Sequence, residues 1–130
     1  MDNRAIGEWI AYSDMDLSSA KYLCGMNPKP LEIICYHCQQ SAEKILKAYW
    51  IYRNINPPWT HDLELLRAEC ETYDDSFTDI NGACGRLSGY SIQPRYPSGI
   101  DLVESDMELA IKDSEKISKF VRERIKFEEC

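Results

Sequence analysis

The chain has 130 residues, of which 44% are hydrophobic, 28% charged and 11% aromatic. A chain of this length buries roughly two-thirds of its unfolded surface in one core, and this composition excludes disordered, collagen-like and coiled-coil classes, so we expect one domain over residues 1–130. The excess of 22 acidic over 15 basic residues gives a net charge of −7, which argues against broad nucleic-acid binding, RNA included.

The sequence also lacks the signals of membrane insertion and export. No apolar run approaches the roughly 18 residues of a membrane span. The first residues, MDNRAIGEWIAYSDMD, contain acids where a secretory leader needs a basic start and an apolar stretch. We therefore expect a cytoplasmic protein with no membrane segment, and reduced thiols rather than disulfides for its six cysteines.

Two long helices are predicted in the first half of the chain. Inward-facing residues recur at spacings of four and three from Asn3 to Cys24, and Gly25 ends this pattern. A second helix follows the turn at 27–30 and ends near Arg53, because the segment NINPP cannot stay helical. Its core face is expected to contain Leu31, Ile34, Cys35, Cys38, Ala42, Ile45, Leu46, Tyr49 and Tyr52.

Two short helices and one long helix are predicted in the second half. Thr60 is expected to cap a short helix that extends to Cys70. Ser76 with Asp79 resembles a capping box for the next short helix.

A loop from 88 to 99 then leads to a last helix from about 101 to 127, with Val103 among its inward residues. No segment alternates like a strand, so we predict an all-α, antiparallel up-and-down bundle of about five helices, three long and two short.

The Cys35-x-x-Cys38 spacing, with His37 inside it, has two interpretations. One is a metal site or a redox pair. The other is a pair of buried thiols, which we favour because both cysteines lie within a helical pattern and no second paired ligand motif follows. We therefore expect no metal and no cofactor.

A second pattern on the same helix lies opposite the expected core face. It consists of Tyr36, Gln40, Glu43, Lys47 and Trp50, at steps of four and three. Two aromatic rings combined with an amide, an acid and a base are typical of a ligand or subunit surface. The alternative is an exposed helix face with ordinary side-chain pairs.

Two further segments contain side chains suited to chemistry. At the predicted helix start, His61 could serve as a base or ligand with Asp62 as its orienting partner, although capping alone explains an acid there. The loop YSIQPRYP at 90–97 holds Arg95 and Tyr96 between prolines. Arg95 is our leading anion ligand, and the alternative is that it pairs with a carboxylate and tethers the loop.

Three segments lie between an amphipathic first helix and a long last helix: CYHCQQSAEKILKAYW, THDLELL and YSIQPRYP. Through these segments the chain resembles the HEPN domain family of bacteria and archaea over essentially its whole length. The resemblance implies about five helices, frequent homodimers, nucleotide binding and pairing with a minimal nucleotidyltransferase as a toxin–antitoxin system. The motif residues that it carries over are Gln40, Glu43, Lys44, Lys47, His61, Asp62, Arg95, Tyr96 and Pro97.

HEPN members that cut RNA resemble one another in an arginine followed, after four to six residues, by a histidine. The nearest pair here, Arg53 and His61, has seven residues between its members, two of them prolines, so the usual form of this motif is absent. We therefore expect a non-catalytic dimeric module that binds a nucleotide or a nucleotidyltransferase.

Two alternatives stay open. One is a metal-independent ribonuclease in which His61 is the acid or base and Arg53 or Arg95 stabilises the phosphorane charge. The other is a scaffold in which the stripe from Tyr36 to Trp50 forms the dimer interface.

Overall fold

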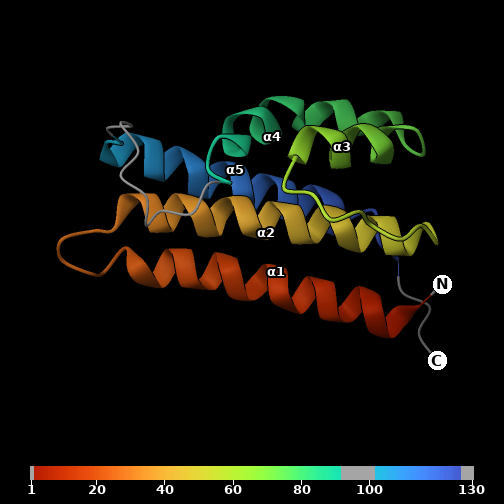
Figure 1. The fold of residues 1–130 in the computed structure, drawn as a ribbon, viewed down its shortest axis with the longest axis horizontal. Coiled ribbons are helices and arrows are strands. Elements are labelled where there is room, and N and C mark those ends of the chain that lie inside the picture. The colour runs from red at the N-terminus through yellow and green to blue at the C-terminus, as the bar shows by residue number, and fades with distance from the viewer. Residues whose placement is uncertain (1, 92–101, 127–130) are drawn as a thin grey trace.

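Three long and two short α-helices, with one 3-10 helix between the short ones, make up the part of the chain that the computed structural model describes, residues 2–91 and 102–126 (Figure 1). No β-strand occurs in these two ranges. The predicted all-α bundle is therefore confirmed. Its elements are α1 (Asn3–Leu23), α2 (Leu31–Tyr52), α3 (Leu63–Glu71), η1 (Asp75–Ile80), α4 (Asn81–Ser88) and α5 (Glu104–Arg122).

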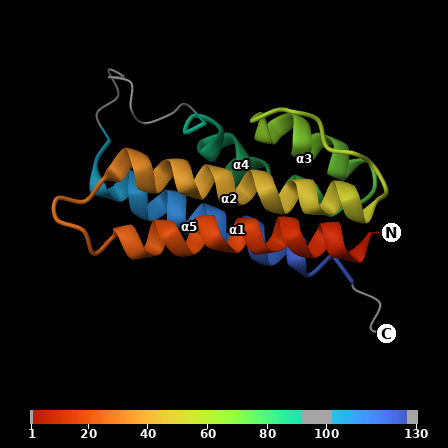
Figure 2. The same cartoon turned by 60° about the horizontal axis from the view of Figure 1, so that its bottom comes forward.

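Helix α2 is the centre of the bundle. It packs antiparallel to α1, and α5 contacts both of these helices, while α3 and α4 cover the side of α2 away from α1 (Figures 1 and 2). The expected alternation of direction changes at one point, because the connection 53–62 returns along α2 before α3 begins, so that α2 and α5 run the same way (Figure 1). This returning connection places the start of α3 beside the middle of α2.

The central position of α2 explains its unusual burial. From Cys38 to Trp50 every residue except Lys44 is buried, including the polar ones. The predicted apolar face is correct, but α1 on one side and α3 on the other also cover positions that an isolated amphipathic helix would expose. Polar groups in such a position need partners within the protein.

The first residue of α3 is set by a different cap from the predicted one. The Asp62 carboxylate, not the Thr60 hydroxyl, accepts hydrogen bonds from the backbone N–H groups of Glu64 and Leu65. Thr60 instead accepts a bond of 3.1 Å from the N–H of Asp62 through its side chain. A charged acceptor at the helix start is also favoured by the helix dipole.

The predicted capping box at Ser76 is also wrong. Asp74 caps the 3-10 helix η1 and accepts bonds of 2.9 and 2.6 Å from the backbone N–H and the hydroxyl of Ser76. These bonds, together with the Arg124 guanidinium 3.3 Å away, lower the pKa of the Asp74 carboxyl. The α-helical part of this segment, α4, begins only at Asn81.

The last helix, α5, is shorter than predicted within the described residues. It begins at Glu104 and ends at Arg122, while the predicted ends at 101 and 127 lie outside those residues. Val103 was expected to face inward, but it is exposed at the cap position, where the backbone is extended. The helical phase that places Met107 in the core therefore does not extend back to Val103.

Within the described residues, no helix combines the length and apolar character needed to cross a membrane.

Cys35 and Cys38 lie in the core and are free thiols. Burial raises the pKa of the Cys35 thiol to about 11 and also raises the pKa of Cys38, because a thiolate would lose its hydration there. Thiolate is the form that binds metals and attacks disulfides. Among the described residues, no group of three or more His, Cys, Asp or Glu side chains is arranged to hold a metal ion.

Candidate functional site

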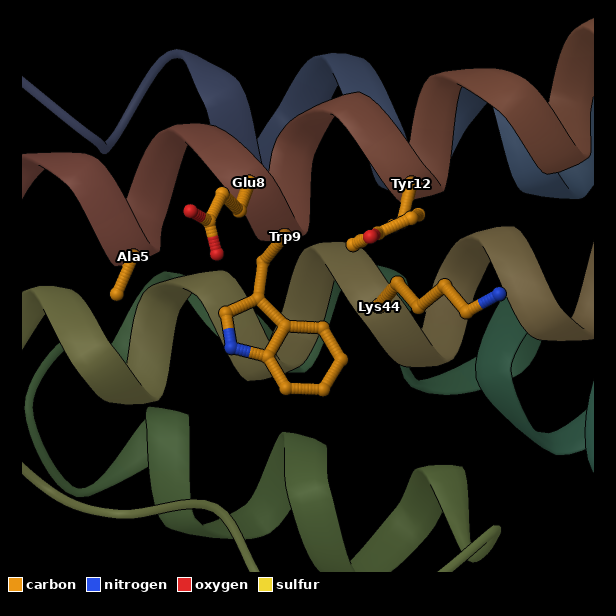
Figure 3. A pocket seen from close by; sticks show the side chains of 5 residues that line it. All are labelled: Ala5, Glu8, Trp9, Tyr12 and Lys44. Carbon is orange, nitrogen blue, oxygen red and sulfur yellow. The ribbon is translucent and has the colours of Figure 1, made fainter.

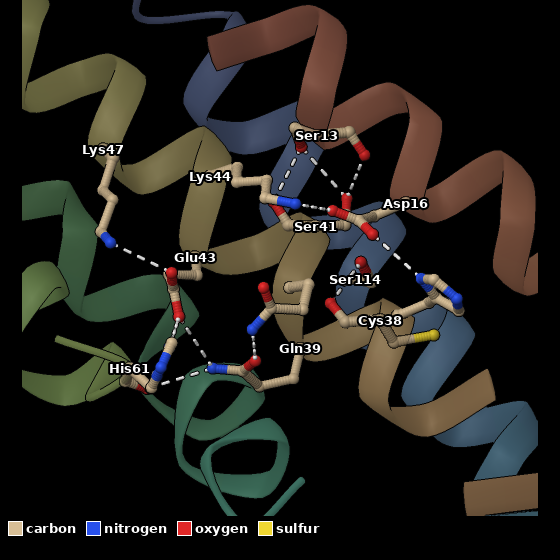
Figure 4. A network of polar contacts seen from close by, with 12 residues as sticks. Ser13, Asp16, Cys38, Gln39, Ser41, Glu43, Lys44, Lys47, His61 and Ser114 are labelled. Atoms are coloured by element: carbon tan, nitrogen blue, oxygen red, sulfur yellow. Dashed lines mark hydrogen bonds and ion pairs between the residues drawn. The ribbon is translucent and has the colours of Figure 1, made fainter. Parts of the chain in front are cut away.

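A connected set of polar side chains lies between α2 and the segment before α3 (Figure 4). We call this set the Glu43 cluster; it consists of Gln39, Gln40, Glu43, Lys47 and His61. The sequence predicted four of these five as ligand-binding residues, and the structure brings those four together. This side of α2 lies opposite the apolar face, as predicted, but it is not an exposed surface, because Gln40, Glu43 and Lys47 are buried.

The Glu43 carboxylate joins a lysine and a histidine. One oxygen, Oε2, accepts a bond of 3.0 Å from Lys47 Nζ, and the other, Oε1, lies 2.8 Å from His61 Nδ1. The side chains of Glu43 and Lys47 are only 5% and 8% exposed, whereas that of His61 is 65% exposed. Since an ionised carboxylate only accepts, Nδ1 of His61 carries its hydrogen, and a ligand can approach the second ring nitrogen from solvent.

Gln39 holds the position of His61 and was not predicted as a site residue. Its Nε2 donates a bond of 3.0 Å to the backbone carbonyl of His61, and its Oε1 accepts one of 2.7 Å from Gln40 Nε2. Gln39 is fully buried although it is polar. The sequence signal that could have identified it is its place four residues before Glu43, on the same side of the helix.

The connection 53–62 explains how His61 reaches Glu43 from 18 residues away. Pro57 and Pro58 exclude a helix there, and the chain runs back along α2 (Figure 1). Asp62 then starts α3 and sets where the segment stops. Asp62 was predicted to bind a ligand, but its role as the cap of α3 explains its presence next to His61.

A second polar group joins α2 to α1. Asp16 of α1 is buried and contacts two residues of α2, with His37 Nδ1 2.9 Å from one oxygen and the Lys44 ammonium paired with the other (Figure 4). Lys44 was predicted to bind a ligand, and the structure places it here, apart from the Glu43 cluster. Asp16 was missed because an acid within an apolar repeat resembles an ordinary surface residue.

A surface pocket lies next to the Glu43 cluster. It has a volume of about 350 Å³, and Lys47 forms part of its wall. The Lys47 ammonium is 5.7 Å from the centre of the Trp9 ring, and the Trp59 side chain is fully exposed. The residues that line the pocket are Trp9, Lys47, Ile51, Asn56, Pro57, Pro58 and Trp59. Sequence reasoning did not single out Trp9 or Trp59 as site residues.

Two other predicted residues are not part of the Glu43 cluster. Trp50 is buried and its indole N–H donates a 3.0 Å bond to the Leu66 carbonyl, so the ring packs inside the chain rather than on an outer face. Tyr36 is half-buried beside His37. Arg95 and Tyr96 lie outside the described residues.

Arg53 was an alternative partner for His61. Its guanidinium donates bonds of 3.0 and 2.8 Å to the Tyr49 hydroxyl and also lies over the rings of Tyr52 and Tyr73. Through these contacts Arg53 stabilises the end of α2. Its guanidinium is bound to tyrosine side chains and not to His61.

Comparisons with known proteins agree with the resemblance found in the sequence. A model of the HEPN domain matches residues 6–124. The crystal structure of TT1696 from Thermus thermophilus is 27% identical, with a TM-score of 0.81, and the alignment covers 95% of this chain and 99% of that one. The structure of ST0689, an archaeal HEPN homologue, is 23% identical with a TM-score of 0.72, covering 93% and 98%. No curated protein matches the chain.

Proposed function

Because the chain belongs to the HEPN domain family, we propose that it is a non-catalytic, homodimeric module that binds a nucleotide or a minimal nucleotidyltransferase partner in a toxin–antitoxin type system. The observation that carries the nucleotide part is the pocket that Lys47 lines together with two tryptophans, Trp9, whose ring centre is 5.7 Å from the Lys47 ammonium, and the exposed Trp59. Aromatic faces bind bases, and an ammonium binds phosphate.

The Glu43 cluster suits this role. Glu43 fixes the Lys47 ammonium, which has three donors and uses one of them on that carboxylate. The remaining N–H donors of Lys47 and the exposed His61 imidazole can then bind one phosphate group, and the site does not carry a large excess of positive charge. Such a site favours a mononucleotide over a polynucleotide, in keeping with a chain of net charge −7. Arg95 and Tyr96 stay predicted as further ligands from the loop.

Replacing Trp59 by alanine tests the stacking surface. Trp59 is fully exposed, so the Trp59→Ala variant should fold like the wild type. Stacking of a base on an aromatic ring contributes about 1–3 kcal/mol, so we expect an affinity for AMP or GMP that is roughly tenfold weaker. Isothermal calorimetry with AMP, GMP, ATP and GTP measures this. Tyr22→Ala, which removes another exposed ring at the far end of α1, should bind like the wild type.

The two remaining parts of the proposal need separate measurements. Light scattering should give twice the chain mass of 15.1 kDa for a homodimer. Co-expression with a nucleotidyltransferase encoded beside this chain should yield a complex that survives size-exclusion chromatography. If no nucleotide gives heat in the calorimeter and no complex elutes, the proposal is wrong.

A ribonuclease is the second candidate, and one observation favours it. An exposed imidazole whose Nδ1 bonds to a buried carboxylate is a common arrangement for a general acid or base, because the carboxylate fixes the tautomer and the ring orientation. His61 and Glu43 form this pair. The charge-stabilising arginine would then come from Arg95, since Arg53 is bonded to Tyr49.

The ribonuclease candidate predicts that His61 is indispensable for cleavage. His61→Ala should lower the cleavage rate of single-stranded RNA by about a hundredfold or more if the imidazole transfers a proton. The measurement is the rate of product formation on a gel in EDTA with the purified wild type and variant. Intact RNA with wild-type protein, or equal cleavage by His61→Ala, removes this candidate.

A further inference from the structure

A second pocket, on the outer surface between α1 and α2, is not used by the proposed function. Its volume is about 430 Å³, and it is lined by Ala5, Glu8, Trp9, Tyr12 and Lys44 (Figure 3). In Figure 3 the Trp9 ring is seen face-on where it lies across α2, and the Tyr12 ring is seen nearly edge-on beside it. The Glu8 carboxylate lies on the other side of Trp9 from Tyr12. Two aromatic rings, those of Trp9 and Tyr12, therefore form one part of the pocket wall, and the Glu8 carboxylate forms another; we call this arrangement the corner.

This combination of groups fits an organic cation. The face of an aromatic ring attracts a positive charge, most strongly for tryptophan, and a carboxylate adds an opposite charge and hydrogen-bond acceptors. Among organic cations, a planar guanidinium fits the aromatic face and the carboxylate best, since it can stack on the flat Trp9 ring and donate two hydrogen bonds to the Glu8 carboxylate. An anion in the same corner would face Glu8 directly.

Three basic residues near the pocket do not change this conclusion. The Lys47 ammonium is 5.7 Å from the centre of the Trp9 ring, but it is held in a buried ion pair with Glu43 and does not line this pocket. The Lys44 ammonium points away from Trp9 in Figure 3 and is neutralised by Asp16, so Lys44 lines the pocket with its methylene stem. Arg4 Nε lies 3.3 Å from Glu8 Oε1, but both side chains are largely exposed. Such a surface pair is weak, and a better-placed guanidinium can displace it.

We propose that this corner binds the guanidinium of an arginine side chain that a partner protein presents on a basic segment. The net charge of −7 attracts such a segment at long range, and the pocket opens on the outer face of α1, where a side chain from a second protein can enter. The two pockets share Trp9, but this proposal uses Glu8 and Tyr12, which do not line the nucleotide pocket at Lys47 and Trp59.

The test uses the three tryptophans of the chain as reporters. Each gives one indole N–H peak in a ¹⁵N–¹H correlation spectrum, and the Trp9 peak is identified by its loss in Trp9→Phe. Titration with the peptide acetyl-Gly-Arg-Gly-amide should shift the Trp9 peak with a dissociation constant in the millimolar range, whereas the peak of the buried Trp50 should stay in place. The same peptide with citrulline, which has the shape of arginine without its charge, should cause no shift.

Glu8→Gln should weaken the arginine peptide at least about threefold, because the opposite charge is lost. The matched control is Glu115→Gln, which removes another exposed glutamate from a surface pair, that with Lys21 at 3.2 Å, and should leave the affinity unchanged. Equal shifts with the citrulline peptide, or wild-type affinity in Glu8→Gln, would overturn the proposal. Both outcomes are independent of whether nucleotides bind at Lys47.

Discussion

Glu43→Gln should destabilise the protein by about 3 kcal/mol, because it leaves the ammonium of Lys47 buried without its counter-charge. The amide can still accept the hydrogen bond from His61 through its oxygen. Its NH₂ group then faces the Lys47 ammonium, so that two donors oppose each other where an ion pair was. The measurement is the free energy of unfolding from urea denaturation followed by circular dichroism.

Two controls identify the cause of this loss. Lys47→Met removes the buried charge, so in the Glu43→Gln background it should restore about half of the lost free energy, which a double-mutant cycle records as coupling. Glu8→Gln breaks a pair of the same i, i+4 spacing on the surface, and it should cost less than about 0.5 kcal/mol. A cost below about 1 kcal/mol for Glu43→Gln would contradict the assigned burial of the pair.

Phe77→Ala should cost about 4 kcal/mol, the largest loss of stability that we expect from any single substitution. Phe77 is fully buried, and its ring centre lies 4.7 Å from that of Tyr49 on α2 and 5.1 Å from that of Phe120 on α5. Truncation opens a cavity between three segments and removes both ring contacts. Since η1 is short, few other contacts can compensate. The same urea denaturation experiment measures the change.

The control for Phe77→Ala is Tyr22→Ala, which deletes an aromatic ring that is almost fully exposed. Its free energy of unfolding should stay within about 0.5 kcal/mol of the wild type. If Phe77→Ala also remained within that range, η1 would not be part of the cooperative core.

The sequence predicted the first two long helices well because their signals are local. Hydrophobic residues at helical spacing, the stop at Gly25 and the prolines after Arg53 act within a few residues of themselves, and α1 and α2 begin and end almost where expected. Helix starts were predicted less well. Several acidic and hydroxyl side chains lie near a helix start, and the path of the chain into the helix decides which of them caps it. At α3 this residue is Asp62 and not Thr60.

The candidate site shows the same division. The sequence identified Gln40, Glu43, Lys47 and His61, three of them by helical spacing on α2 and the fourth by its place at a helix start. It did not indicate that Glu43 and His61 touch, since this contact depends on the connection that returns along α2. It also placed the stripe on an outer face, although α3 covers part of it, as the bond from Trp50 to Leu66 illustrates.

The residue pattern by itself therefore determined that the chain is helical, where its long helices lie, and which polar residues of α2 share a side. These properties follow from backbone hydrogen bonds and side-chain periodicity, which act over a few residues. Only the tertiary structure decided that this side is buried, that Asp16 pairs with Lys44, and that Trp9 lines two pockets. Burial and long-range contacts depend on which segments pack together, and no local spacing encodes that choice.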